Sequence, residues 1–512
     1  MAGYTKKYLL IYLAQGTSML LGMLSLFIVT PFITSNKEVY GVYAICVSLT
    51  IFFSYADIGF LGAAQKFSAE SYIRGDRKEE MAIMGFSCAV LLSLLMILSL
   101  GLLILAYRPE YLIKGISDEN YHIARSLLLI LACSSPIFCF QRLIQVIFSV
   151  RLADYYYQTI QIIGSLIRIS SAPFFFMYGN YDIVGYYLMC QIINLVFLII
   201  SFYIAKRKFS IEFLVIIRNL KFRKTTYDLL SGLAFASLFG TICWVLYYEL
   251  DNIVISKLLG AEAVAIYAIA FSILTVLRNL FGTLFGPYQT RYNYYIGMGD
   301  ISGLNKFVKF QMMFFYPICV IPILVMIVLS KPFIVSWVGW AYLDSSKVLR
   351  FLLLCNILAF VSYPSGIYLT ALKKLNVMYI SSGIIVIVFW VGVLSLYNHI
   401  GVCAFALMKA IGMIFSALYV TFVVLKLMGD SFLSFVMQMA KSYLVPTSLC
   451  VLLLNIIAPF MQMEKGREDL LLNILVIALS GIISFFIFYL FSSLFRKDIN
   501  TLVCHFKADR TT

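Results

Sequence analysis

Long apolar stretches alternate with short polar ones along almost the whole chain. An α-helix needs about 20 mostly apolar residues to cross the hydrocarbon layer of a membrane, and by this measure the chain has about fourteen spans. Their expected ranges are 8–33, 39–60, 81–106, 123–150, 156–178, 183–205, 229–256, 261–289, 308–330, 346–371, 376–397, 401–427, 440–460 and 470–494. The pattern predicts an all-α polytopic membrane protein.

Composition excludes a soluble globular fold. Of the 512 residues, 62% are hydrophobic and 12% are charged, so the polar surface could not cover the apolar surface in water. The net charge of +15 would suggest nucleic acid as the partner of a soluble protein, but in a membrane protein it indicates basic cytoplasmic loops. The eleven cysteines form no CxxC pair, and the three histidines are scattered near loops. We expect no metal site, no other cofactor and no nucleic acid.

An early segment of the chain is repeated in the middle. Tyr43-Ala44-Ile45 matches Tyr267-Ala268-Ile269, and Gly75-Asp76 matches Gly299-Asp300. Further pairs at the same offset of 224 residues are Ser48 with Ser272, Gly62 with Gly286, and Gln65 with Gln289. Several residue types matching in one register indicate an internal duplication, in which two halves share one topology.

The duplication predicts two pseudo-symmetric six-helix lobes followed by two further helices. Residues 1–205 would form the first lobe and 229–430 the second, while 431–512 would hold helices 13 and 14 and a cytoplasmic tail. The basic segment 206–228 would join the lobes. It is mildly amphipathic, so it either lies on the anionic inner leaflet or forms a solvated linker.

Loop charges predict the orientation. With both termini in the cytoplasm, roughly 25 basic residues lie inside and roughly 8 outside, in agreement with the positive-inside rule. The outer loops are short, and the chain has no P-loop, nucleophile elbow or pair of carboxylates on a soluble loop. An ATP-driven pump or a hydrolase therefore has no support, and we do not expect an enzyme.

The opening of the chain resembles the polysaccharide-repeat-unit flippases, the Wzx-type family of O-antigen and capsule synthesis. In that family the first helix ends with a proline and the second helix starts with the motif "YG-Y". The motif "D-G" lies at the end of the second helix, and a "GD" pair lies in the cytoplasmic loop after it. The matching positions are Pro31, Tyr40-Gly41, Asp57 with Gly59, and Gly75-Asp76, and Asp251, Tyr267-Ala268 and Pro287 resemble the family's seventh and eighth helices. The six-plus-six-plus-two layout extends the resemblance over the whole chain. One departure is the turn before Tyr40, SNKEV, which lacks the expected Leu-Gly.

The resemblance implies a flippase of the multidrug/oligosaccharidyl-lipid/polysaccharide exporter superfamily in the bacterial cytoplasmic (inner) membrane. It would move a polyprenyl-pyrophosphate-linked oligosaccharide repeat unit by alternating access of two lobes, for O-antigen of lipopolysaccharide, capsule or exopolysaccharide. The implied partners are this lipid-linked substrate and the bilayer. Coupling to protons or sodium, and docking of polysaccharide-assembly enzymes on 206–228, remain open.

Four cations lie deep within predicted spans, where a charge costs several kcal/mol unless something compensates it. They are Arg142, Arg168, Arg278 and Lys409. The functional interpretation is a water-filled cavity whose cations bind the pyrophosphate, for which arginine offers two parallel donors. The structural alternative is that these side chains pair with acids on neighbouring helices or extend to the membrane surface.

Three acids are candidates for ion coupling. Glu249 and Asp251 lie in the outer part of the seventh span, and Asp57 lies near the inner end of the second. Each could bind a proton or sodium ion, although Glu249 and Asp251 are two residues apart and should not share one helix face. The alternative places these two carboxylates at the solvated outer interface.

Three other functions remain in view. A cation-coupled multidrug antiporter has the same fold but should have an acidic cavity, whereas the buried charge here is mainly positive. A lipid II flippase would share the cationic cavity. A membrane glycosyltransferase or polymerase commonly needs a sizeable outer loop bearing acids or arginines, and the short outer loops make it the weakest alternative.

Overall fold

The computed structural model describes residues 2–177, 181–211 and 213–508. Within these ranges the secondary structure is helical, with no β-strand. Twelve helices of the described part are long and apolar enough to cross a membrane, and there are fourteen spans if each of two bent pairs counts as one. The prediction of an all-α protein with about fourteen spans is confirmed. The last residue of the expected span 156–178 lies outside the described ranges. Residues 509–512 of the expected tail also lie outside them.

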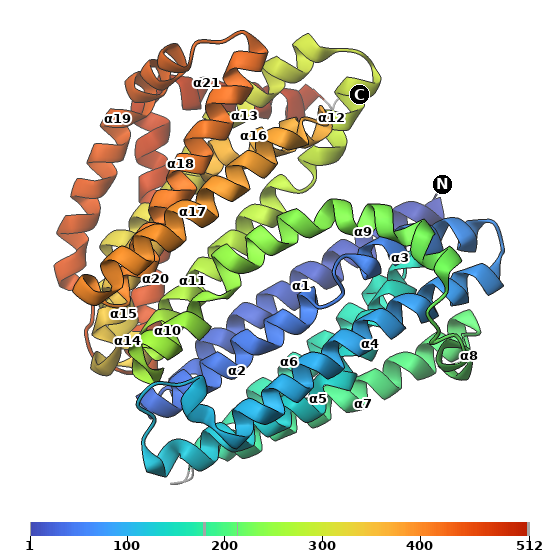
Figure 1. Cartoon of the computed structure of the whole chain (residues 1–512). Coiled ribbons are helices and arrows are strands. Elements are labelled where there is room, and N and C mark those ends of the chain that lie inside the picture. The colour runs from blue at the N-terminus through green and yellow to red at the C-terminus, as the bar shows by residue number, and fades with distance from the viewer. Residues whose placement is uncertain (1, 178–180, 212, 509–512) are drawn as a thin grey trace. The chain divides into compact units, whose positions relative to one another are not determined.

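Contacts divide the chain into two compact units, Met1–Ala265 and Ile266–Thr512. Helices of the first unit are α1 (Ala2–Ile33), α2 (Lys37–Tyr55), α3 (Phe60–Ile73), α4 (Arg77–Tyr107), α5 (Asp118–Val150), α6 (Asp154–Phe176), α7 (Ile183–Phe209), α8 (Phe213–Arg218), α9 (Lys224–Trp244), the π-helix η2 (Val245–Glu249) and α10 (Asp251–Leu259). In this unit α5 packs against α2, α3, α4 and α7, while α1 packs against α6 and α9 packs against α3 (Figure 1).

The second unit begins within α11 (Ala261–Phe285). Its further helices are α12 (Tyr288–Gly297), α13 (Ile301–Val328), α14 (Ser330–Val338), α15 (Leu343–Leu354), α16 (Ala359–Ala371), α17 (Leu375–Ile400), α18 (Cys403–Met428), α19 (Phe432–Ile457), α20 (Arg467–Phe491) and α21 (Ser493–Ala508). The pair α17–α18 packs on α15 and α16, and α20 packs on α13, α14 and α19. Short 3₁₀ helices of three residues each lie at Pro109–Tyr111 in the first unit and at Trp340–Tyr342 and Ala458–Phe460 in the second. The predicted lobe boundary at 206–228 stays a prediction.

Two spans are broken rather than straight. The bend between η2 and α10 is 41°, and the bend between α15 and α16 is 44°. The first follows a π-helical stretch, where an extra residue per turn interrupts the regular hydrogen bonding of the helix. Glu249 is the last residue of that stretch and Asp251 the first of α10, so the two candidate carboxylates flank the bend.

The expected second span, 39–60, is too long. The α2 helix ends at Tyr55, and the backbone then turns through Ile58 and Gly59, whose φ angles of 50° and 81° are left-handed. The Asp57 carboxylate accepts a hydrogen bond from the Leu61 N–H at 2.9 Å and so satisfies one of the free donors at the start of α3. The turn is therefore stabilised locally, and apolar length alone did not reveal it.

The sequence repeat is also a structural repeat at its turns. Gly75 and Gly299 both have positive φ, at 78° and 73°. The carboxylate of Asp76 accepts from the Glu79 N–H at 3.0 Å, and that of Asp300 accepts from the Gly303 N–H at 2.7 Å. Each aspartate therefore caps the helix that follows it, α4 in one unit and α13 in the other. The two turns carry the same glycine and the same cap, 224 residues apart.

The connection between α7 and α9 is shorter and better packed than predicted. Helix α7 continues to Phe209, α8 lies beside α4, and α9 begins at Lys224 (Figure 1). A Cβ atom at Gly85 of α4 would lie 2.4 Å from the carbonyl oxygen of Asn219, so the backbone after α8 rests directly on α4. This contact fixes the segment at Asn219, while most of its described side chains stay exposed, so both alternatives for the segment, a position on the inner leaflet and a solvated linker, remain predictions.

Candidate functional site

Arg168 is held by a polar network that joins three helices of the first unit. Its Nη2 donates to the amide oxygen of Asn194 in α7 at 2.6 Å. Asn194 in turn donates to Gln191 at 3.2 Å, and Gln141 of α5 donates to the Asn194 carbonyl at 3.2 Å. Gln141 and Gln191 are buried, whereas Arg168 is half-buried. The network therefore fixes the direction of a charge that keeps some exposure.

The structure brings Arg142 close to this network. Its guanidinium makes two long hydrogen bonds, to Gln145 at 3.4 Å and to the Ser54 carbonyl at 3.5 Å, which are weak at these distances. Tyr157 of α6 interacts electrostatically with both Arg142 and Arg168. Neither arginine forms an ion pair with an acid of the described residues. Two predicted cations thus lie around one half-buried tyrosine with their charge not neutralised by those acids.

The other two predicted cations lie in the second unit in different surroundings. Lys409 of α18 is fully buried, and its Nζ lies 5.2 Å from the ring centroid of Phe271 and 5.4 Å from that of Phe389. A cation over an aromatic face is attracted by the negative face of the ring, which offsets part of the cost of burial. Arg278 of α11 is half-buried and interacts electrostatically with Tyr363 of α16.

The candidate carboxylates are buried, so the solvated alternative for Glu249 and Asp251 does not agree with the structure. Glu249 Oε1 accepts from the Tyr55 hydroxyl at 3.4 Å and from the Trp244 indole N–H at 3.3 Å, and the same indole donates to Tyr55 at 2.9 Å. Asn252, beside Asp251, donates to Ser48 of α2 at 2.6 Å. Asp57 already caps α3, which gives that carboxylate a structural task.

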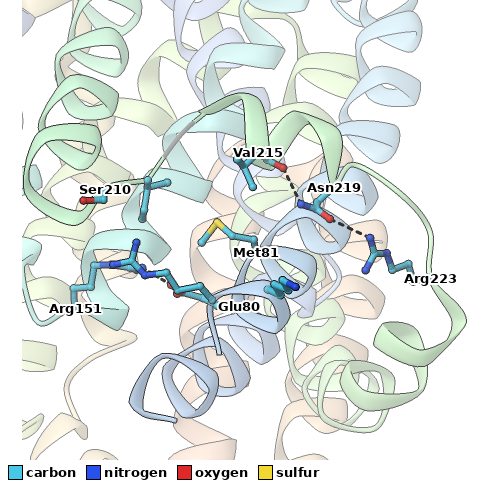
Figure 2. A pocket seen from close by; sticks show the side chains of 10 residues that line it. Glu80, Met81, Arg151, Ser210, Val215, Asn219 and Arg223 are labelled. Carbon is cyan, nitrogen blue, oxygen red and sulfur yellow. Dashed lines mark hydrogen bonds and ion pairs between the residues drawn. The ribbon is translucent and has the colours of Figure 1, made fainter. Parts of the chain in front are cut away.

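Sequence reasoning missed a basic pocket at the ends of α4 and α5. The Glu80 carboxylate and the Arg151 guanidinium form a buried ion pair there, with side chains 0% and 2% exposed (Figure 2). Arg151 also donates to the Ile147 carbonyl at 3.1 Å and lies 4.7 Å from the ring centroid of Tyr72. The pocket has a volume of about 460 Å³. Glu80 begins one apolar stretch and Arg151 follows another, so their pairing depends on helix packing and leaves no local sequence signal.

No group of three His, Cys, Asp or Glu side chains that could bind a metal occurs among the described residues. The chemistry that the candidate residues offer is therefore charge, hydrogen bonding and aromatic contact.

Family comparison agrees with the resemblance seen in the sequence. The family described as polysaccharide biosynthesis protein matches residues 4–291, more than half of the chain. The chain belongs to this family. A curated relative, the uncharacterized membrane protein EpsK of Bacillus subtilis (strain 168), is 24% identical over 345 residues. That match covers 65% of this chain and 66% of the relative, slightly less than two thirds of its length.

Solved structures show which fold this family member has. The lipid II flippase MurJ, in an inward closed conformation, matches with a TM-score of 0.68 and 16% identity over 94% of this chain and 99% of the other. An inward-facing multidrug resistance MATE family transporter matches with a TM-score of 0.63 and 14% identity over 80% and 94%. At such identities the likeness shows the fold alone. The matched family and this fold agree with the resemblance to polysaccharide flippases that the sequence showed.

Proposed function

We propose that this polysaccharide biosynthesis protein moves a polyprenyl-pyrophosphate-linked oligosaccharide repeat unit across the bacterial cytoplasmic membrane. The product would supply O-antigen, capsule or exopolysaccharide synthesis. Both termini would be cytoplasmic, as the distribution of basic loop residues predicts. Family membership supports a role in polysaccharide synthesis, and the fold shared with a solved lipid II flippase supports lipid-linked cargo.

The observation that carries this proposal is the placement of Arg168. Its guanidinium is directed by Asn194, keeps partial exposure and is not paired with an acid of the described residues. A pyrophosphate carries negative charge on several oxygens, and a guanidinium with a fixed plane can donate to two of them at once. Arg142, which interacts electrostatically with the same tyrosine as Arg168, would contact the same group.

Arg278 and Lys409 would provide the second unit's share of the binding charge. In this conformation Lys409 is covered by Phe271 and Phe389. We propose that alternating access uncovers it, because a fully buried ammonium cannot contact a phosphate. Cargo binding would then favour the conformation in which the lysine is exposed, since a ligand shifts a conformational equilibrium by its difference in affinity for the two states.

Glu249 is the best of the three acids for a coupling role. It is buried beside the π-helical bend and accepts from Tyr55 and Trp244, so taking up a proton would change the hydrogen bonds between α2 and the seventh span. Asp251 lies on the other side of the bend and would be the second candidate. Asp57 is the weakest because capping α3 already explains it.

Two transport alternatives differ in cargo charge. A drug antiporter binds organic cations, and the uncompensated arginines of the first unit argue against such cargo. A lipid II flippase would use the same cations, so rescue of cell-wall synthesis after depletion of the host's own lipid II flippase distinguishes it. Loss of a polymerase would leave single repeat units on the outer face of the membrane. Loss of a flippase would instead trap them on the inner face.

The deciding experiment measures the side on which the lipid-linked repeat unit lies. A strain that cannot polymerise the units is treated with a membrane-impermeant glycan label, with the protein present, absent or carrying Arg168→Gln. We expect outer-leaflet labelling with the wild type and none without the protein or with Arg168→Gln. The control Arg108→Gln removes a charge from an exposed loop and should give the same labelling as the wild type. Equal labelling without the protein would overturn the flippase proposal, and normal labelling with Arg168→Gln would overturn the site.

A further inference from the structure

The basic pocket of the first unit lies where predicted membrane spans begin and end, the level at which we expect lipid headgroups. It is formed where α4 begins and where α5 and α7 end, and the backbone after α7 closes it (Figure 2). Membrane helices change from apolar to polar residues where hydrocarbon gives way to headgroups. At about 460 Å³ its volume falls within the range of roughly 300–1,000 Å³ that is usual for ligand pockets.

Three cations of the pocket remain available to a ligand. Arg77 and Lys78 at the start of α4 and Arg223 before α9 line the pocket and are exposed. None of them forms an ion pair with an acid of the described residues, while the charges of Glu80 and Arg151 cancel in their own pair. The pocket therefore favours a negatively charged group, and these donor types bind phosphate oxygens.

Asn219 keeps one of these cations in place. Its amide nitrogen donates to the Val215 carbonyl at 2.9 Å, which turns its oxygen toward Arg223, and Arg223 donates to that oxygen at 3.1 Å (Figure 2). Because the backbone at Asn219 is packed against Gly85, the position of the Arg223 side chain is linked to the body of the unit. The cation belongs to a built pocket and not to a free chain segment.

The buried carboxylate adds a second requirement. One Glu80 oxygen binds Arg151, but the other is buried and has no hydrogen-bond donor among the described residues. A buried acceptor without a donor costs about 1–3 kcal/mol or more, so a ligand that supplies an O–H group would be favoured. The pocket thus combines donors for a phosphate with an acceptor for a hydroxyl.

Exposed apolar side chains next to the pocket favour a lipid over a soluble phosphate. Leu214 and Ile217 of α8 and Phe222 before α9 are all exposed. Side chains of this kind at a membrane surface insert between acyl chains, and basic residues beside them attract anionic headgroups. A free phosphate would have no contact with them.

We propose that this pocket binds the headgroup of an anionic phospholipid whose phosphodiester carries a free hydroxyl, as in phosphatidylglycerol. The phosphate contacts Arg77, Lys78 and Arg223. The Glu80 side chain is buried in this conformation, and a turn of that side chain brings its second oxygen to the pocket, where a glycerol hydroxyl donates to it. The pocket contains none of the four predicted cargo cations, so this lipid site is additional to the proposed cargo site.

Binding is tested on the purified full chain in detergent by native mass spectrometry with phosphatidylglycerol. The variant Arg77→Gln/Lys78→Gln/Arg223→Gln should bind at least about tenfold more weakly. The matched control, Arg218→Gln/Lys221→Gln/Lys224→Gln, removes three exposed charges from the same segment that do not line the pocket, and should bind like the wild type. Equal losses in both variants, or no loss in either, would overturn the proposal. Unchanged elution and melting temperature establish that both variants are folded.

Three competitors define the chemistry. Phosphatidylcholine has no net negative charge and should not compete. Phosphatidic acid has the phosphate without the glycerol hydroxyls and should bind more weakly than phosphatidylglycerol. Tighter or equal binding of phosphatidic acid would overturn the role of Glu80. Soluble glycerol 3-phosphate should compete only at far higher concentration, and competition at equal concentration would mean that the site takes soluble phosphates and not lipid.

Discussion

Arg168 of α6 donates to the side-chain oxygen of Asn194 in α7 over 2.6 Å, and this bond sets the direction of a partly buried positive charge. An amide fixes the guanidinium without neutralising it, whereas a carboxylate would do both. Binding and releasing an anion on each transport cycle requires a cation that is held in place and still attracts negative charge. The choice of asparagine at position 194 is therefore part of the proposed site.

Two substitutions of Asn194 separate orientation from charge. Asn194→Leu removes the acceptor, and we expect flipping to fall severalfold but less than with Arg168→Gln. Asn194→Asp keeps an acceptor but forms an ion pair, so we expect a greater loss than with leucine. The measurement is outer-leaflet glycan labelling at matched protein levels, with Asn455→Leu, an exposed amide of α19, as the control. Full activity of Asn194→Asp would contradict a role for uncompensated charge.

Lys409→Met distinguishes a functional lysine from a structural one. Methionine has a similar length and keeps the apolar contacts with Phe271 and Phe389, so the variant should still fold, as its melting temperature and elution will show. Flipping should nevertheless be lost if cargo contacts the ammonium in another conformation. Lys426→Met, at the exposed end of the same helix, should preserve both properties. A destabilised variant with normal flipping would assign Lys409 to packing alone.

The buried pair of Glu80 and Arg151 gives a stability prediction with a recognisable pattern. Removing one partner, as in Glu80→Leu or Arg151→Met, should destabilise the protein by about 3–5 kcal/mol because the other charge stays buried. The double variant should recover most of that loss, since apolar side chains often replace a buried pair without a net cost. The stability of all three variants is measured by heating each protein and using size-exclusion chromatography to determine the fraction that stays folded at each temperature. Additive losses in the double variant would show that the two side chains act independently.

The helices could be predicted because membrane insertion depends on apolar length, which a sequence displays directly. The repeated turn could also be predicted from the sequence. Gly75 and Gly299 have positive φ angles, which glycine favours, and Asp76 and Asp300 after them are residue types that commonly cap helices. These features are local. The early end of α2 at Tyr55 was missed because its cause, the Asp57 cap on α3, lies inside an apolar stretch that reads as one span.

Pairings between distant residues could not be predicted. The sequence showed that Arg168 needs a partner but not that Asn194, 26 residues later, supplies it without charge. It also showed basic residues at 206–228, but not that one of them, Arg223, lines a pocket together with Glu80 and Arg151. Such contacts depend on how helices rotate about their axes and pack, and 71 residues separate the two members of the buried ion pair. A single sequence carries no direct record of that geometry.

Gly85 should be essential for holding the α7–α9 connection against α4. In a helix, replacing glycine by alanine normally stabilises by about 0.5–1 kcal/mol, because alanine loses less backbone entropy on folding. At Gly85, however, the new methyl group would lie 2.4 Å from the Asn219 carbonyl oxygen, which is backbone and cannot rotate away. Overpacking of this kind costs about 1–3 kcal/mol, so the sign should reverse and Gly85→Ala should destabilise the protein.

The control is Gly62→Ala in α3, where nothing lies within 4 Å of the added Cβ atom. Its melting temperature should stay the same or rise, while that of Gly85→Ala falls. Arg218, Lys221 and Arg223 are already exposed, but trypsin cuts slowly where the backbone is held in place. Displacement of the segment should free that backbone, so limited proteolysis should cut the Gly85→Ala variant faster between α8 and α9. Equal cutting rates and equal melting temperatures for the two variants would mean that the connection does not depend on contact with Gly85. In that event the basic pocket would lack the fixed wall that its lipid selectivity requires.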